Sequence, residues 1–103
     1  MRIAVPVNED NGLDSTVCEH FGHAPYFALI DVEGNDVSLS IFPNPAVEHA
    51  AGQIPKMLAE KGVNMIIASR MGEKAKLFFK QFGIEAVTGA TGTLRDIISR
   101  ITA

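Results

Sequence analysis

The chain has 103 residues, 47% of them hydrophobic and 20% charged, a composition that favours a single domain over residues 1–103 and excludes a disordered chain. Its formal charge of −3 argues against nucleic acid as a partner, because phosphate binding needs a concentrated basic surface. The one cysteine, Cys18, excludes a disulfide framework and a self-contained four-thiolate zinc or iron–sulfur site.

The first half of the chain predicts three strands. Residues 3–7 form a short apolar run typical of a buried strand, and Pro6 is expected near its end because proline cannot donate to a ladder. Residues 26–32 are rich in β-formers, and residues 37–42 alternate between apolar and polar side chains. The turn formers at 33–36 join these two segments into a hairpin.

The second half of the chain predicts helices that alternate with strands. From Val47 the apolar residues follow a helical period, and Gly52 and Pro55 place the start of the regular helix near Gln53. The nearly continuous apolar run over 63–68 is typical of a strand that is covered on both faces. The remaining predicted elements are a helix over 71–82, a short strand over 84–87 and a helix over 94–101.

The predicted element order is β-β-β-α-β-α-β-α. The alternating half needs crossover connections, so its strands are expected to be parallel, whereas the first hairpin adds antiparallel pairing. Thr93 followed by Asp96 resembles a capping box at the start of the last helix. The predicted fold class is therefore α/β, a mixed sheet with three helices.

The sequence contains no membrane or export signal that we recognise. No apolar run approaches the roughly 20 residues that a membrane span needs. The N-terminal apolar residues meet the polar residues 8–10 too early for a signal-peptide core. A lone thiol fits a reducing compartment, so we expect a soluble cytoplasmic protein without a membrane partner.

Three loops are expected to converge at one edge of the sheet, where the parallel strands end. These are residues 8–23, 69–72 and 88–93. The last two lead into helices and therefore offer backbone N–H groups and a positive dipole end to an anion. Gly72, Gly89 and Gly92 would allow close approach of a ligand. Taken alone, each is better explained as a turn glycine, since loops need positive φ angles whether or not a ligand binds.

The densest chemical segment has the spacing C-x-H-x-x-H. Its thiol and two imidazoles are donors suited to zinc, copper or iron, so Cys18, His20 and His23 are predicted metal ligands. The spacing matches no recognised zinc signature, and His49 is the only other histidine. The alternative is a loop in which Cys18 packs, His20 caps backbone groups and His23 faces solvent.

Catalytic arrangements are only weakly indicated. Cys18 beside His20 or His23 would form a thiolate–imidazole pair, but neighbours so close in a loop rarely have the required geometry. The acidic residues between 9 and 14 lie in a polar stretch that is typical of solvated loops. The glycine-bearing loop after the last strand matches no Walker or dinucleotide fingerprint. We therefore predict no catalytic residue and do not expect an enzyme.

Four segments carry a resemblance to a known family. They are MRIAVPV at 1–7, EHFGHAPYF at 19–27, NP at 44–45 and GATGT at 89–93. Together they resemble the dinitrogenase iron–molybdenum cofactor biosynthesis family, small proteins and domains similar to accessory proteins that carry nitrogenase cofactor or its iron–sulfur precursor. The resemblance spans essentially the whole chain, and H-F-G-x-A-P-x-F is its most specific motif.

This resemblance implies a ribonuclease H-like mixed sheet, in agreement with the predicted element order. It does not imply nuclease activity, because nucleases of that fold hold metal ions with several carboxylates and residues 3–7 contain none. It implies that the protein binds, protects or delivers an iron–sulfur or iron–molybdenum type metallocluster. The implied partners are an apo-acceptor or a cluster-assembly protein.

Two positions depart from the family pattern. Position 23 is often arginine in the family but is His23 here, which replaces a permanent cation with a titratable ligand. Residues 69–72 are less glycine-rich than the usual family loop, and Arg70 could supply the missing cation.

We therefore hypothesise a carrier site formed by Cys18, His20 and His23, which the loops at 70–72 and 89–93 complete. A preassembled cluster carries its own sulfides, so one or two protein ligands suffice for capture and release. The predicted cofactor-binding residues are His20, Phe21, Gly22, His23, Arg70, Gly72, Gly89, Thr91, Gly92 and Thr93.

Two alternatives from other classes remain open. One is a small-molecule or phosphate-binding enzyme that uses the same sheet edge, which predicts turnover. The other is a regulatory or interaction domain whose third strand or loop edge meets a protein partner. Iron and sulfide retained after anaerobic purification would favour the carrier over both.

Overall fold

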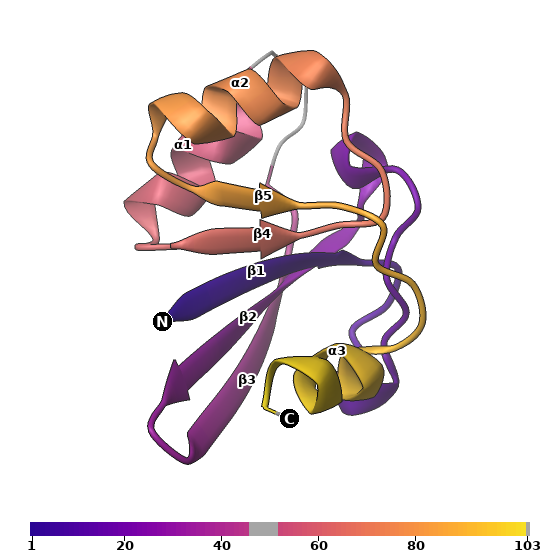
Figure 1. Ribbon diagram of the computed structural model, residues 1–103. Coiled ribbons are helices and arrows are strands. Elements are labelled where there is room, and N and C mark those ends of the chain that lie inside the picture. The colour runs from indigo at the N-terminus through magenta and orange to yellow at the C-terminus, as the bar shows by residue number, and fades with distance from the viewer. Residues whose placement is uncertain (46–51, 103) are drawn as a thin grey trace.

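A mixed five-stranded sheet organises the chain, and the computed structural model describes residues 1–45 and 52–102 (Figure 1). The strand order across the sheet is β3-β2-β1-β4-β5. β2 lies antiparallel to both β1 and β3, whereas β1, β4 and β5 are parallel. The strand bounds are β1 Arg2–Val7, β2 Tyr26–Glu33, β3 Asp36–Pro43, β4 Met65–Ile67 and β5 Glu85–Val87.

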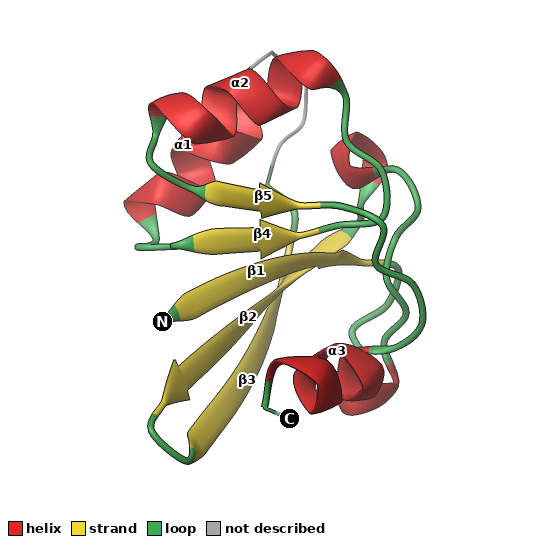
Figure 2. Cartoon of the chain, in the orientation of Figure 1, coloured by secondary structure: helices red, strands yellow, loops and turns green. Residues whose placement is uncertain are grey.

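The described helices cover both faces of this sheet (Figures 1 and 2). α1 (Gln53–Glu60) and α2 (Glu73–Gln81) lie on one face, and α3 (Leu94–Ile101) lies on the other. The predicted mixed α/β class with three helices is thus confirmed. The first part of the predicted apolar stripe, from Val47 to Ala51, and His49 with it, lie in 46–51, outside the described residues. The rest of the stripe lies in α1, which begins at Gln53 as predicted.

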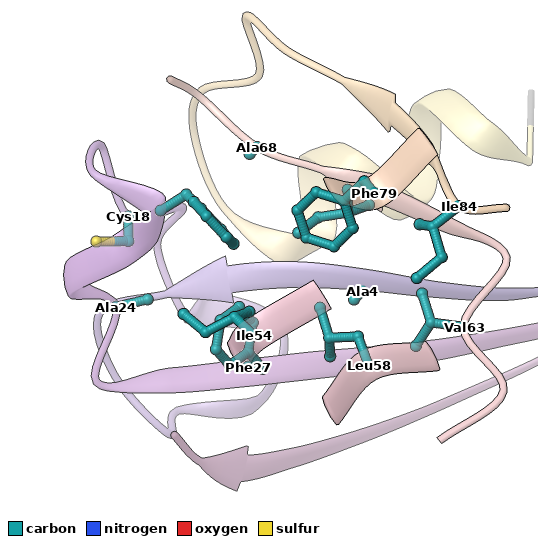
Figure 3. Close-up of a cluster of buried hydrophobic side chains, with 12 residues drawn as sticks. Ala4, Cys18, Ala24, Phe27, Ile54, Leu58, Val63, Ala68, Phe79 and Ile84 are labelled. Carbon is teal, nitrogen blue, oxygen red and sulfur yellow. The ribbon is translucent and has the colours of Figure 1, made fainter. Parts of the chain in front are cut away.

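Side chains alternate between the two faces and build two clusters of buried residues among those described. Phe27 packs with Leu58 and Phe79 under α1 and α2 (Figure 3). Ile66 of β4 belongs to the same cluster. Ala28 and Ile67 point the other way and pack with the apolar residues of α3. β4 is therefore covered on both faces, as its continuous apolar run predicted.

The central strand carries the predicted proline near its end. Pro6 is fully buried and pairs in register with Phe27 of β2. Its carbonyl accepts a hydrogen bond from the backbone N–H of Cys18 at 2.8 Å. Within residues 1–45 and 52–102, no helix has the length and apolar character needed to cross a membrane.

α3 begins at the capping box predicted from Thr93 and Asp96. The Thr93 hydroxyl accepts a hydrogen bond from the Asp96 backbone N–H at 3.3 Å, and the Asp96 carboxylate accepts one from the Thr93 N–H at 3.0 Å. Gly92, directly before the cap, has φ +96°, a conformation that residues with a side chain rarely adopt. A Cβ placed there would lie 2.5 Å from the Asp96 carboxylate.

Replacing Gly92 with alanine is expected to destabilise the fold, by about 1–2 kcal/mol from the backbone alone and further through the clash with the cap. Gly34→Ala is the matched control, because Gly34 has φ +59° and open space around its Cβ position. Urea unfolding measures both variants. A loss of stability in Gly92→Ala no larger than that in Gly34→Ala would contradict the clash.

Two carboxylates fasten the loops at this end of the sheet. Glu9 accepts hydrogen bonds from the backbone N–H of Thr16 at 2.8 Å and from its hydroxyl at 2.7 Å. These bonds hold the pKa of Glu9 below its usual value, the backbone N–H having the larger effect. The corresponding bonds from Thr93 lower the pKa of Asp96.

The stability of the protein should therefore fall in acid. A carboxyl whose pKa is lowered on folding stabilises fully above its unfolded pKa, and this contribution is lost as the pH falls through the folded pKa. We expect Tm to drop below about pH 4, more steeply in the wild type than in a Glu9→Gln/Asp96→Asn variant. Thermal melts followed by circular dichroism between pH 3 and 7 test this, and a Tm difference that stays constant with pH would refute it.

Candidate functional site

An open pocket of about 640 Å³ lies where β1 and β4 end. Its volume is in the range of small-molecule sites. The predicted site residues that line it are His20, Phe21, Gly22, His23, Arg70 and Gly72. The lining residues not named in that prediction are Ser69, Met71, Lys76 and Thr88.

The three predicted loops converge at this edge, and backbone pairing holds them together. His20 forms a parallel bridge with Arg70, which joins the loop after β1 to the loop after β4. The Gly89 N–H donates to the carbonyl of Ser69 at 2.9 Å, which joins the loop after β5. The Val17 N–H donates to the carbonyl of Gly92 at 2.9 Å, which joins the loop after β1 to the loop after β5.

A short 3-10 turn, Phe21–His23, carries the pocket's aromatic anchor. Phe21 is buried, with its ring centre 5.5 Å from that of Phe79 and 6.4 Å from that of Phe27. The Asn44 amide donates to the carbonyl of Ala24 at 3.0 Å and so ties the end of β3 to this turn. The turn is therefore fixed to the core through Phe21, although it lies in a loop.

The two histidines on either side of this anchor are exposed at the rim of the pocket. His20 and His23 have ring centres 6.3 Å apart with the planes at 88°. The backbone N–H of His23 donates to the carbonyl of His20 at 3.0 Å, which sets their relative placement. Two imidazoles at this separation can both contact one group that sits between them.

Cys18 occupies a different environment from the histidines. It is buried at one end of the cluster under α1 and α2 (Figure 3), and its thiol donates to the carbonyl of His20 at 3.3 Å. It does not line the pocket. Among the residues that the structure describes, no three His, Cys, Asp or Glu side chains are gathered so that they could hold a metal ion. Cys18, His20 and His23 thus do not form a ready three-ligand site in this conformation.

The loop after β5 contributes less to the lining than its glycines suggested. Thr88 reaches the pocket, whereas Gly89 lines a separate groove beside α3. Gly92 and Thr93 pair instead with residues 16–17, and Thr91, directly before Gly92, is exposed. None of these four predicted residues lines the pocket, and Gly89, Gly92 and Thr93 instead hold the surrounding loops together.

The charge of the lining is positive although the chain as a whole is acidic. Arg70 and Lys76 contribute permanent cations, and no carboxylate is among the described residues that line the pocket. An Arg70 guanidinium nitrogen lies 3.7 Å from a Glu19 carboxylate oxygen, with both side chains largely exposed. Such an exposed pair is weak, so an anion in the pocket can compete with Glu19 for Arg70.

Lys76, in the first turns of α2, lines the pocket but was not predicted as a site residue from the sequence. Its N–H donates to the carbonyl of Gly72 at 3.1 Å, so it lies one helical turn after the loop residue. Residues four apart share a helix face, and this spacing was the signal that could have found it.

The sequence model of the family described as dinitrogenase iron-molybdenum cofactor matches residues 1–103. The chain is also similar to an uncharacterized protein of Methanocaldococcus jannaschii. The two are 29% identical over 102 residues, which cover 95% of this chain and 82% of that protein.

Solved structures with a similar fold include the crystal structure of PH0822, with a TM-score of 0.90 at 32% identity over 99% of this chain and 90% of that one. The NMR structure of a proposed NifB protein from Thermotoga, of the DUF35 family, has a TM-score of 0.75 at 27% identity, over 98% and 86%. The apo form of the orange protein from Desulfovibrio gigas has a TM-score of 0.82 at 25% identity, over 97% and 85%. Because the family model matches all 103 residues, the chain belongs to the dinitrogenase iron-molybdenum cofactor family.

Proposed function

We propose that this protein binds and carries a metallocluster of the iron–sulfur or iron–molybdenum type at the pocket beyond β1 and β4, without chemical turnover. The observation that carries the proposal is the lining, in which two imidazoles and two cations face one open space and none of the described lining residues is a carboxylate. Membership of the family supports the same cargo.

The donor chemistry of the lining fits such a cargo. Imidazole is a ligand suited to iron, and a cluster with its own sulfides needs few ligands from the protein. Arg70 and Lys76 would balance the negative charge of the cluster, as Arg and Lys do for other anions. Cys18 enters the proposal as a third ligand only if its thiol leaves the His20 carbonyl.

We also propose a partner, a cellular compartment and a fold relationship for the protein. The partner would be an apo-acceptor or a cluster-assembly protein in the cytoplasm. The placement of β2, antiparallel between β1 and β3, supports a ribonuclease H-like relationship. β1 has the sequence RIAVPV and so carries no carboxylate for nuclease chemistry.

The two histidines provide the first test. A His20→Ala/His23→Ala variant is expected to weaken cluster binding by about tenfold or more, since each substitution removes a direct ligand. Its Tm should stay near that of the wild type because both side chains are exposed. Anaerobic reconstitution with iron and sulfide, followed by absorption spectroscopy and iron analysis, gives the measurement. Unchanged binding in the double variant would remove this site from the proposal.

The exposed ion pair at the rim provides the second test. Glu19→Gln should strengthen cluster binding by about two- to fivefold, because Arg70 no longer has a competing carboxylate. Asp14→Asn is the matched control, since Asp14 pairs with Arg95 at 3.3 Å, also exposed and away from the pocket. Titrations at low and high salt should show the Glu19 effect shrinking as salt rises. Equal effects of the two substitutions would argue against an anionic ligand at Arg70.

A further inference from the structure

All nine glycines lie in the described residues, and they fall into two classes. Seven have a positive φ angle, so the backbone itself requires glycine there. Gly22 and Gly72 do not, and both line the same pocket. The backbone explanation for glycine therefore fails only at these two positions.

Packing does not explain these two glycines either. A Cβ built on Gly22 or on Gly72 meets no atom of the protein within 4 Å. Gly72 precedes α2 with φ −68° and ψ 156°, an extended conformation that any residue adopts. Serine, threonine, asparagine or aspartate would cap that helix at least as well, and no side chain caps it here. The fold would thus accept a side chain at both positions.

The two glycines come from the two loops that enclose the pocket. Gly22 is the middle residue of the 3-10 turn Phe21–His23, between the exposed histidines. Gly72 lies two residues after Arg70 in the loop after β4. The bridge between His20 and Arg70 holds these loops together, so the space left by each missing side chain belongs to one cavity.

We propose that Gly22 and Gly72 are contact positions for the ligand, which occupies the space that side chains would fill, and that they thereby set the size of ligand the pocket admits. The inference rests on the proposed function and deepens it. A bulky polynuclear cluster that reaches from the histidines to Arg70 and Lys76 touches both loops. A mononuclear anion bound at the two cations has no need of the space at Gly22.

The test compares a large and a small probe in the whole 103-residue chain. Wild type, Gly22→Ala, Gly72→Ala and the double variant are titrated anaerobically with a cluster assembled from iron and sulfide, and separately with inorganic phosphate. An added methyl group in a filled pocket costs about tenfold or more in affinity. We expect this loss for the cluster in each variant and a change of less than about twofold for phosphate in Gly22→Ala.

Stability separates this effect from misfolding. At compatible backbone angles alanine restricts the unfolded chain, so Tm should be unchanged or higher in Gly22→Ala and Gly72→Ala. Gly34→Ala is the matched control, because its positive φ should lower Tm while cluster affinity stays at the wild-type value. Gly72→Ser is a second variant that improves the helix cap but fills the same space.

Each outcome decides the inference. Cluster binding that falls in the alanine variants with Tm retained supports it. Equal cluster binding by all variants overturns the assignment of the glycines and leaves the proposed function standing. Wild-type protein that takes up phosphate but no cluster overturns the proposed function together with the size selection. Wild-type protein that takes up neither probe overturns both as well.

Discussion

The end of the pairing between β1 and β4 is the constraint on which the site depends. Ile3 and Ala4 pair with β4, but Pro6 lacks the N–H that would continue the ladder on that side of β1. Its carbonyl instead accepts the N–H of Cys18, so the segment after the first loop replaces β4 as the neighbour of β1. Because the strands part here, the loops that leave them can form a pocket rather than close over a continuous sheet.

The buried aromatic ring of Phe21 fixes the position of the loop that lines the pocket where the strands separate. Burial of a phenylalanine contributes about 1.5–3 kcal/mol, and Phe21 buries its ring against Phe27 and Phe79 while its neighbours stay exposed. The backbone of His20 and His23 is therefore held by the core, although both side chains lie at the surface. A loop fastened in this way offers its donors without the entropy loss of an unanchored loop.

The sequence pattern predicted the regular elements because burial follows a fixed repeat, as the alternation of β3 and the stripe of α3 show. β1 was predicted from its continuous apolar run, which fits a strand with buried side chains on both faces. The 3-10 turn Phe21–His23 has no such repeat, and it was predicted only as loop. Composition also could not distinguish a buried Cys18 from a ligand, since a thiol suits both environments. The glycines at 89 and 92 were ambiguous for the same reason: only their positive φ angles show that the backbone requires them.

On the proposed function, the contrast between the buried Phe21, which fixes the loop to the core, and the exposed charged side chains at the edge of the pocket explains how a cargo could be held and then passed on. Phe21 is buried, whereas the charged side chains at the pocket edge are solvated: those of Arg70 and Glu19 are 70% and 64% exposed. An exposed pair contributes about 0–1 kcal/mol, so exchanging Glu19 for an anionic cluster requires little reorganisation of the protein. Retention then depends on direct contacts with the imidazoles and with the backbone at the two pocket glycines, not on enclosure. An acceptor that offers thiolates to the exposed side of the cluster could remove it without unfolding the carrier, because no part of the core has to open.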